Sequence, residues 1–141
     1  MKSAGSGVAA FLRGAIGTIL LATAVGKFLD IPGFARILGQ YQTFPERALF
    51  PLAVAIPAVE LAVGLWLFSG RNLVGAALVS TAMHLTYAAW SAISVLRGLR
   101  LPNCGCFGVF LARPLTWATV IEDLTLAGAS AALFVLALRR A

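Results

Sequence analysis

Two cysteines separated by a single glycine are the clearest candidate for chemistry in this sequence, within the segment Asn103-Cys104-Gly105-Cys106-Phe107-Gly108. In a non-helical segment, cysteines at i and i+2 can bring their α-carbons within the roughly 4.4–6.8 Å that a disulfide needs. Gly105 relieves backbone strain between them, and Gly108 permits a turn. A bridge that closes so small a ring is strained, and strained exposed disulfides tend to be labile and oxidising. The motif therefore predicts a reversible dithiol/disulfide pair that exchanges electrons with a partner.

Other interpretations of the cysteine pair stay open at this point. A permanent structural bridge is a poor role, because so short a loop gains little loop-closure entropy. Two thiolates are also suited to a soft metal ion such as Hg(II) or Cu(I). The sequence has only these two cysteines and one histidine, so it lacks the ligands for a closed structural zinc site. An inert loop is the remaining alternative.

Ionisable residues inside long apolar runs are the second group of candidates. Glu60 and His84 each lie well inside an apolar run, entered from opposite sides. At about 1.5 Å per helical residue, both side chains are expected roughly 15 Å deep and able to face each other. Glu122 and Asp123 enter from the cysteine side and reach a shallower depth. Charges in hydrocarbon cost several kcal/mol unless they are paired or protonated, so such residues are functional candidates.

Glu60 and His84 have two competing interpretations. They could relay protons or hydrogen-bond a quinone headgroup. Alternatively, an interhelical hydrogen bond holds the bundle together, a role that Lys27 or Arg13 could also fill with a carboxylate. Four aromatic residues near the expected helix ends are interpreted as membrane-interface anchors. These are Trp66, Tyr87, Trp90 and Trp117.

The elements that must position these residues are four long apolar runs. They cover about Val8 to Leu29, Ala48 to Phe68, Leu73 to Leu96, and Leu115 to Leu138. Each is close to the roughly 20 residues that a helix needs to cross a hydrocarbon core. Membrane-spanning strands would be shorter and would alternate in polarity, which these runs do not. The sequence predicts an all-α, single-domain bundle of four transmembrane helices over residues 1–141.

The link between the first two runs, residues 30–47, is the longest connection that carries no cysteine. Phe34, Ile37, Leu38 and Tyr41 recur there at helical spacing, which predicts a short interfacial amphipathic helix. The first run is interrupted by Arg13, which favours an uncleaved first helix over a signal peptide.

The composition supports a membrane protein and disfavours other classes. Of 141 residues, 60% are hydrophobic and only 11% are charged, against roughly 25% charged in a soluble domain. The net charge of +6 comes from basic residues placed singly at the ends of apolar runs, where they can extend towards lipid headgroups. No contiguous basic patch is present, so nucleic-acid binding is not expected. The basic residues divide almost evenly between the two sides, so they do not determine the orientation.

The arrangement of motifs resembles one known family. The matching elements, in chain order, are Gly26-Lys27-Phe28, Tyr41 with Phe44-Pro45, Pro57 with Glu60 and Gly64, Arg97-Gly98, and Cys104-Gly105-Cys106-Phe107-Gly108. On these residues the chain resembles the MauE-like family, within the broader DoxX-like group of four-helix membrane proteins. The resemblance covers nearly the whole chain.

The resemblance implies a role beside extracytoplasmic thiol chemistry in a bacterial inner (plasma) membrane. MauE-like proteins are associated with methylamine utilisation and with disulfide formation or maturation of a methylamine dehydrogenase subunit, and DoxX-like relatives with quinone-coupled sulfur oxidation. By position, Cys104 and Cys106 become the redox pair, while Lys27 and Glu60 become the polar membrane residues. The cysteine loop is then expected outside the cytoplasm. His84 and the Glu122-Asp123 pair have no counterpart in this pattern.

The expected function is therefore that of a membrane thiol-redox protein, an accessory to thiol–disulfide oxidoreduction. It would pass electrons or disulfides between a thioredoxin-like or other thiol/disulfide protein and a second carrier, for which a quinone is a candidate. Cys104 and Cys106 would carry the redox step, with Glu60 and His84 moving protons. Two rivals remain: a non-enzymatic membrane assembly factor whose cysteines are incidental, and a soft-metal carrier. A homo-oligomer is compatible with the sequence.

Overall fold

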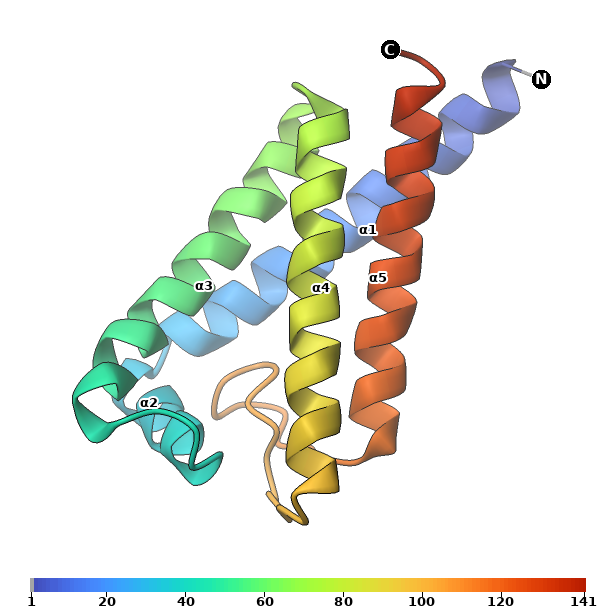
Figure 1. Cartoon of the computed structure of the whole chain (residues 1–141). Helices are drawn as coiled ribbons and strands as arrows, with labels where there is room; N and C mark the ends of the chain where they lie inside the picture. Colours follow the sequence, from blue (N-terminus) through green and yellow to red (C-terminus); the bar gives the residue numbers. More distant parts are fainter. Residues whose placement is uncertain (1) are drawn as a thin grey trace.

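The computed structural model describes residues 2–141, with side chains from Gly5 onward, and contains five helices and no strand within that range. They are α1 (Lys2–Phe28), α2 (Ile31–Gln40), α3 (Glu46–Ser69), α4 (Leu73–Leu96) and α5 (Trp117–Leu138), shown in Figure 1. Four of them, all except α2, are long and apolar enough to cross a membrane. The predicted all-α bundle of four membrane helices with a short helix between the first two is confirmed. α1 begins earlier than the expected Val8.

Local sequence signals explain where the helices begin and end. Asp30 caps α2, because its side chain accepts a hydrogen bond of 2.9 Å from the backbone N–H of Gly33. α3 ends at Gly70, which adopts a left-handed conformation (φ 69°) that glycine tolerates at a helix C-terminus. α5 begins with a capping box between Thr116 and Thr119. These caps satisfy backbone groups that would otherwise be left unpaired at the helix ends.

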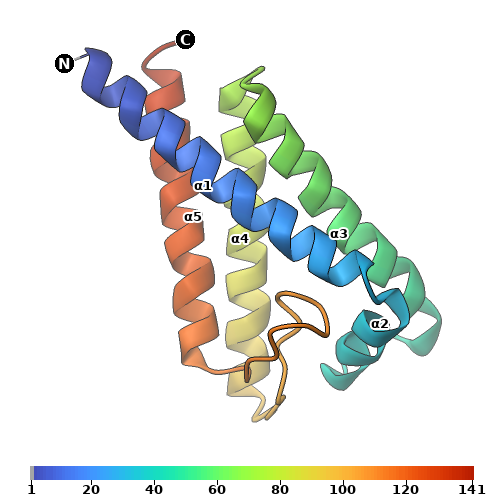
Figure 2. The same cartoon turned by 180° about the vertical axis from the view of Figure 1, so that it is seen from behind.

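The membrane helices form two pairs that meet at one end and separate at the other. α1 packs mainly against α3, and α4 mainly against α5. Figures 1 and 2 show α1 and α3 crossing the bundle diagonally, while α4 and α5 run nearly parallel to each other. Both termini lie at the end where the pairs converge, as an even number of spans requires. A buried apolar cluster from all four helices fills that end. Its buried members are Ala9, Ile16, Leu20, Val63, Leu67, Ala76, Ala77 and Leu133.

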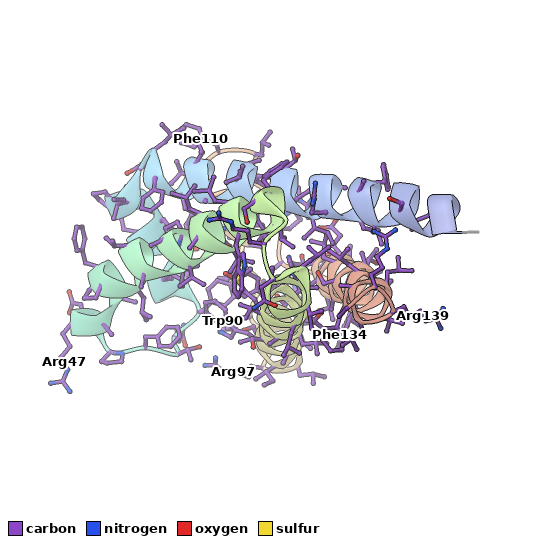
Figure 3. The ribbon with its side chains drawn as sticks, turned by 90° about the horizontal axis from the view of Figure 1, so that it is seen from above. Arg47, Trp90, Arg97, Phe110, Phe134 and Arg139 are labelled. Carbon is purple, nitrogen blue, oxygen red and sulfur yellow. A yellow bond between two sulfur atoms is a disulfide. The ribbon has the colours of Figure 1, made fainter. Side chains whose placement is uncertain are left out.

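At the opposite end, α2 and the 97–116 loop occupy the space between the diverging pairs (Figure 1). α2 buries Phe34 and Leu38 in a cluster with Ala53 of α3. Its neighbouring residues Ile37 and Tyr41 pack instead against the cysteine loop. The apolar side chains of this short helix thus contact α3 on one side and the cysteine loop on the other. At the periphery of the bundle, Arg47 and Arg139 extend outward (Figure 3), as expected for basic residues at helix ends.

A close backbone contact fixes the cysteine loop to the end of α1. A Cβ atom added at Gly26 would lie 2.5 Å from the carbonyl oxygen of Phe107, and one added at Gly108 would lie 2.5 Å from the carbonyl oxygen of Gly26. Gly108 also has a positive φ of 70°. Only residues without a Cβ permit this approach.

We therefore predict that Gly26→Ala destabilises the protein by displacing the loop from α1. The loop backbone cannot yield as a flexible side chain would, so the loss in unfolding free energy should be about 1–3 kcal/mol. Gly14→Ala is the matched control on the same helix, because a Cβ at Gly14 meets nothing within 4 Å. The measurement is chemical or thermal unfolding in detergent. Equal stability of the two variants would contradict the proposed contact.

Candidate functional site

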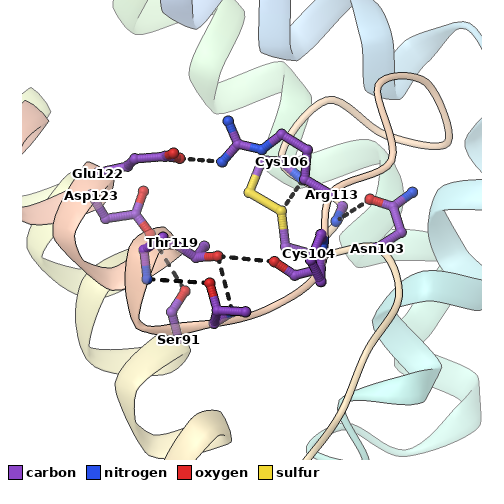
Figure 4. Close-up of a disulfide and its surroundings, with 12 residues drawn as sticks. Ser91, Asn103, Cys104, Cys106, Arg113, Thr119, Glu122 and Asp123 are labelled. Atoms are coloured by element: carbon purple, nitrogen blue, oxygen red, sulfur yellow. Dashed lines mark hydrogen bonds and ion pairs between the residues drawn. A yellow bond between two sulfur atoms is a disulfide. The ribbon is translucent and has the colours of Figure 1, made fainter.

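The cysteine motif forms a disulfide in this structure. Cys104 and Cys106 are bonded, with their α-carbons 5.5 Å apart (Figure 4). This separation lies within the range that disulfides require. Cys104 is only 7% exposed, whereas Cys106 is partly exposed. The two sulfur atoms therefore have different environments although one residue separates them.

Gly105 and Asn103 shape the turn that holds the disulfide. Gly105 has a φ of 80°, and a Cβ there would lie 2.8 Å from Cγ2 of Ile37 on α2. The side-chain oxygen of Asn103 accepts a hydrogen bond of 2.9 Å from the Gly105 N–H, and its amide nitrogen donates to the Gly108 carbonyl at 3.0 Å. The Asn103 side chain thus connects two backbone groups of the motif, at Gly105 and Gly108. Gly105, which has no Cβ, allows the turn to pack closely against α2.

Side chains from α1 and the end of α2 hold the carbonyl groups of both cysteines. The Tyr41 hydroxyl donates to the Cys104 carbonyl at 2.6 Å, and the Lys27 ammonium donates to the Cys106 carbonyl at 2.8 Å. Arg97 in turn donates to the Tyr41 carbonyl at 2.9 Å. Burial, with a smaller contribution from the charge of Asp123, raises the pKa of Tyr41 to about 12. Its hydroxyl therefore remains a donor at neutral pH.

A buried ion pair lies next to the cysteine loop. The Lys27 ammonium lies 3.0 and 2.9 Å from the two carboxylate oxygens of Glu60, and the residues are 5% and 1% exposed. Glu60 also accepts hydrogen bonds from Tyr87 of α4, at 2.9 Å, and from Thr23 of α1, at 3.3 Å. Lys27 and Glu60, which the family resemblance implied as polar membrane residues, thus connect α1, α3, α4 and the loop.

The hydrogen-bond partners of Glu60 and His84 differ from the expected arrangement. Both residues line one cavity, but no hydrogen bond joins them among residues 2–141. His84 Nδ1 instead lies 2.9 Å from the Ser80 carbonyl, which fixes the ring within α4. The buried carboxylate of Glu60 is instead neutralised by the ammonium of Lys27. The contact of Glu60 therefore matches the alternative from the sequence, in which Lys27 pairs with a carboxylate and holds the bundle together.

The interpretation of Tyr87 and Trp90 as interface anchors was wrong. The Tyr87 hydroxyl donates to Glu60 inside the bundle. The Trp90 ring packs against Tyr41, with ring centroids 4.4 Å apart, and lies 5.6 Å from the Phe44 ring centroid. Position along a helix predicts how deep a residue lies in the membrane but not the direction of its side chain. These two side chains point into the bundle. Trp117 is half exposed, as an anchor would be.

A cavity of about 420 Å³ lies between the two helix pairs, with wall residues from all five helices and the loop. The disulfide forms part of its wall at the loop end, and Lys27, Glu60 and Tyr87 form another part. Its volume falls within the range of small-molecule sites. Within the part of the chain that the structure describes, the buried indole N–H of Trp90 and the buried hydroxyl of Ser94 have no hydrogen-bond partner. Such unpaired polar atoms are rare in proteins and mark positions where a ligand or water can bind.

Glu122 and Asp123 have separate environments. Glu122 forms an exposed ion pair with Arg113, whose backbone carbonyl accepts a hydrogen bond of 2.7 Å from the Cys104 N–H. Asp123 lines the cavity and accepts a weak hydrogen bond of 3.4 Å from Ser91 (Figure 4). No ion pair to Asp123 is present among the described side chains. Residues 2–141 also contain no group of three His, Cys, Asp or Glu side chains placed to hold a metal ion.

Sequence reasoning missed some residues that hold the site. Asn103, Thr23 and Arg97 had no assigned role, and Tyr41 had none beyond its place on an amphipathic face and in the family pattern. Tyr41 and Arg97 belong to the motif pattern of the family resemblance, which was the available signal. Thr23 had no signal beyond being polar in an apolar run.

The fold and site together define a polytopic membrane protein with a disulfide in the wall of a cavity between its helices. The family model described as "Methylamine utilisation protein MauE" matches residues 6–137. The chain belongs to this family, which confirms the resemblance to MauE-like proteins.

Relatives carry the same description. The chain is 33% identical over 115 residues to "Methylamine utilization protein MauE" of Paracoccus denitrificans, which covers 82% of this chain and 62% of that protein. It is 28% identical to the protein so described from Paracoccus versutus, with the same coverage, and 29% identical to that of Methylophilus methylotrophus, covering 87% and 65%. The chain thus spans less than two thirds of the length of these relatives. No solved structure shows a significant match.

We predict that Lys27→Met and Glu60→Gln each destabilise the protein, and that their effects are not additive. Each single change leaves one buried group without its ionic partner, which costs about 3–5 kcal/mol. The double variant leaves no unpaired charge, and the amide oxygen introduced by Glu60→Gln still accepts hydrogen bonds from Tyr87 and Thr23. Unfolding of all four proteins in detergent gives the coupling energy. Additive losses would show that the ion pair is not a coupled unit.

Proposed function

We propose that this protein is a membrane thiol–disulfide oxidoreductase component whose Cys104–Cys106 pair passes electrons between an extracytoplasmic thiol protein and a second carrier in the membrane. The observation that supports this proposal most directly is the position of the disulfide. It forms part of the wall of a cavity between membrane-length helices, while Cys106 remains partly exposed. A purely structural bridge across one residue would add little stability.

The chemistry is thiol–disulfide exchange. A partner thiolate attacks one sulfur of the disulfide, the bond between the cysteines breaks, and a mixed disulfide forms. The second partner thiol resolves it, so the partner is oxidised to a disulfide and this protein is reduced to a dithiol. Two electrons and two protons are transferred in total. A two-electron acceptor must then restore the Cys104–Cys106 bond.

A lipophilic quinone fits the role of this second carrier. The cavity is mainly apolar and lies between membrane-length helices, with a buried, unpaired indole N–H at Trp90 that suits a quinone oxygen. His84 has one ring nitrogen held by Ser80 and the other without a protein partner, so it is suited to exchange a proton there. Glu60, through Tyr87, provides a second polar contact to the same space. When bound, the quinone would itself be the two-electron acceptor that restores the Cys104–Cys106 bond.

The substrate protein is proposed from the family. The relatives from Paracoccus and Methylophilus are described as methylamine utilization proteins. We place this chain in the same process, acting on an extracytoplasmic, disulfide-containing protein of methylamine utilisation. The cysteine loop then faces away from the cytoplasm.

We predict that a membrane-impermeant maleimide labels the Cys104–Cys106 motif in intact cells only after mild reduction, and that the partly exposed Cys106 reacts before the buried Cys104. Such labelling, read as a mass shift on the two cysteines, would support an exposed, reducible disulfide on the outer face. Thiols that are labelled without reduction would favour the soft-metal carrier, and labelling only after lysis would contradict the orientation. Replacing both cysteines with serine distinguishes the proposed function from the remaining rival, a non-enzymatic assembly factor. An assembly factor with incidental cysteines would still support methylamine-dependent growth, whereas a thiol-redox protein would not.

A quinone in the cavity predicts a specific effect of Trp90→Phe, which removes the indole N–H and retains an aromatic ring. Loss of one hydrogen bond, about 0.5–1.5 kcal/mol, should weaken binding of a soluble quinone analogue about two- to tenfold. Trp66→Phe is the matched control, because the Trp66 indole donates to Arg71 and does not line the cavity. Equilibrium binding to purified protein is the measurement. Equal affinities of the two variants would contradict a role for Trp90.

A further inference from the structure

We propose that the two cysteines have fixed and different roles: Cys106 forms the mixed disulfide with the partner, and Cys104 is the thiolate that leaves and later closes the bond again. This inference rests on the proposed thiol–disulfide function and names which sulfur reacts first. It follows from the unequal surroundings of the two sulfur atoms.

Accessibility favours attack at Cys106. Cys104 is 7% exposed and belongs to a buried cluster with Ile37, Tyr41, Leu101 and Leu115. Cys106 is partly exposed and lies at the margin of that cluster. Exchange requires a partner thiolate to reach the sulfur that it attacks. The apolar side chains around Cys104 obstruct such an approach, so the new bond forms at Cys106.

The hydrogen bonds favour Cys104 as the leaving group. The backbone N–H of Cys106 donates to Cys104 Sγ at 3.4 Å, because the positive φ of Gly105 turns this N–H back towards the sulfur. A thiolate that accepts a hydrogen bond is stabilised, and a more stable thiolate leaves faster. The backbone of Cys104 is also held on both sides, by Tyr41 at its carbonyl and by Arg113 at its N–H. The released thiolate therefore stays in place to re-form the bond.

Lys27 favours release of Cys106 in the second step. The partner's second thiolate attacks the partner sulfur of the mixed disulfide, and Cys106 leaves with the electron pair. The Lys27 ammonium donates to the Cys106 carbonyl oxygen at 2.8 Å, so its positive charge, which is shared with Glu60, is held at the backbone of the residue whose thiolate departs. Neighbouring cations stabilise thiolates. The two partner protons are taken up by the two cysteines, which completes the transfer of two electrons and two protons.

The test compares Cys104→Ser with Cys106→Ser in the full chain, each with one remaining thiol. Reaction with an aromatic disulfide reagent that releases a coloured thiol should be at least about tenfold faster for Cys104→Ser, which retains Cys106. The wild-type disulfide, treated with glutathione and quenched by alkylation, should carry the glutathione adduct on Cys106 in peptide mass mapping. An adduct on Cys104, or equal rates for the two variants, would overturn the assignment. A wild-type disulfide that millimolar thiols do not reduce would instead contradict the proposed function itself.

Lys27 is tested in the Cys104→Ser background. Lys27→Met should slow the reaction of Cys106, whereas Lys27→Arg should largely preserve it because the positive charge remains. Arg36→Met, which removes an exposed cation from α2, is the matched control and should leave the rate unchanged. Unfolding curves identify any variant that is not folded, and the Lys27→Arg comparison then carries the test. A rate that does not depend on charge at position 27 would overturn this part of the assignment.

Discussion

The buried ion pair between Lys27 and Glu60 is the constraint on which the rest of the site depends. A lysine or glutamate within a membrane-spanning helix is tolerated only when its charge is paired, so the last turn of α1 must lie against the middle of α3. The remaining hydrogen-bonding capacity of the pair then fixes other elements. Glu60 accepts a hydrogen bond from the Tyr87 hydroxyl of α4, and Lys27 donates to the Cys106 carbonyl. One ion pair therefore sets both the helix arrangement and the position of the loop.

The motifs that carry the family resemblance act together in this structure. Gly26 allows the loop backbone to approach α1, Tyr41 binds the Cys104 carbonyl, and Arg97 holds Tyr41 in place. Gly26, Tyr41 and Arg97 lie in three different segments, yet each helps to position the same six residues around the disulfide, 103–108. This explains why elements that are weak signals one by one form a specific pattern in combination. They are the supports of a single loop.

The sequence was sufficient to predict the helices and the cysteine pair, but not the contacts between helices. Hydropathy and length define each span because lipid requires about 20 apolar residues in a helix, and α4 matches its expected range of Leu73 to Leu96. Depth could also be estimated, since rise per residue is fixed. The direction of a side chain depends on the tilt and rotation of its helix, which tertiary packing sets. For this reason the partner of Glu60 was Lys27 instead of His84, and Tyr87 points inward.

The location of the disulfide is suited to the proposed exchange with both a thiol protein and a carrier in the membrane. A cysteine pair on an extended loop would meet aqueous partners but would remain distant from anything dissolved in the membrane. Here the loop returns between the helix pairs, so both cysteines line a cavity between membrane-length helices while Cys106 keeps partial exposure. The glycines at positions 26, 105 and 108 make this return possible, because a side chain at any of them would collide with the loop, α1 or α2. The same tight fit leaves Cys104 buried and Cys106 accessible, so the two sulfur atoms become unequal through the packing that brings them to the cavity.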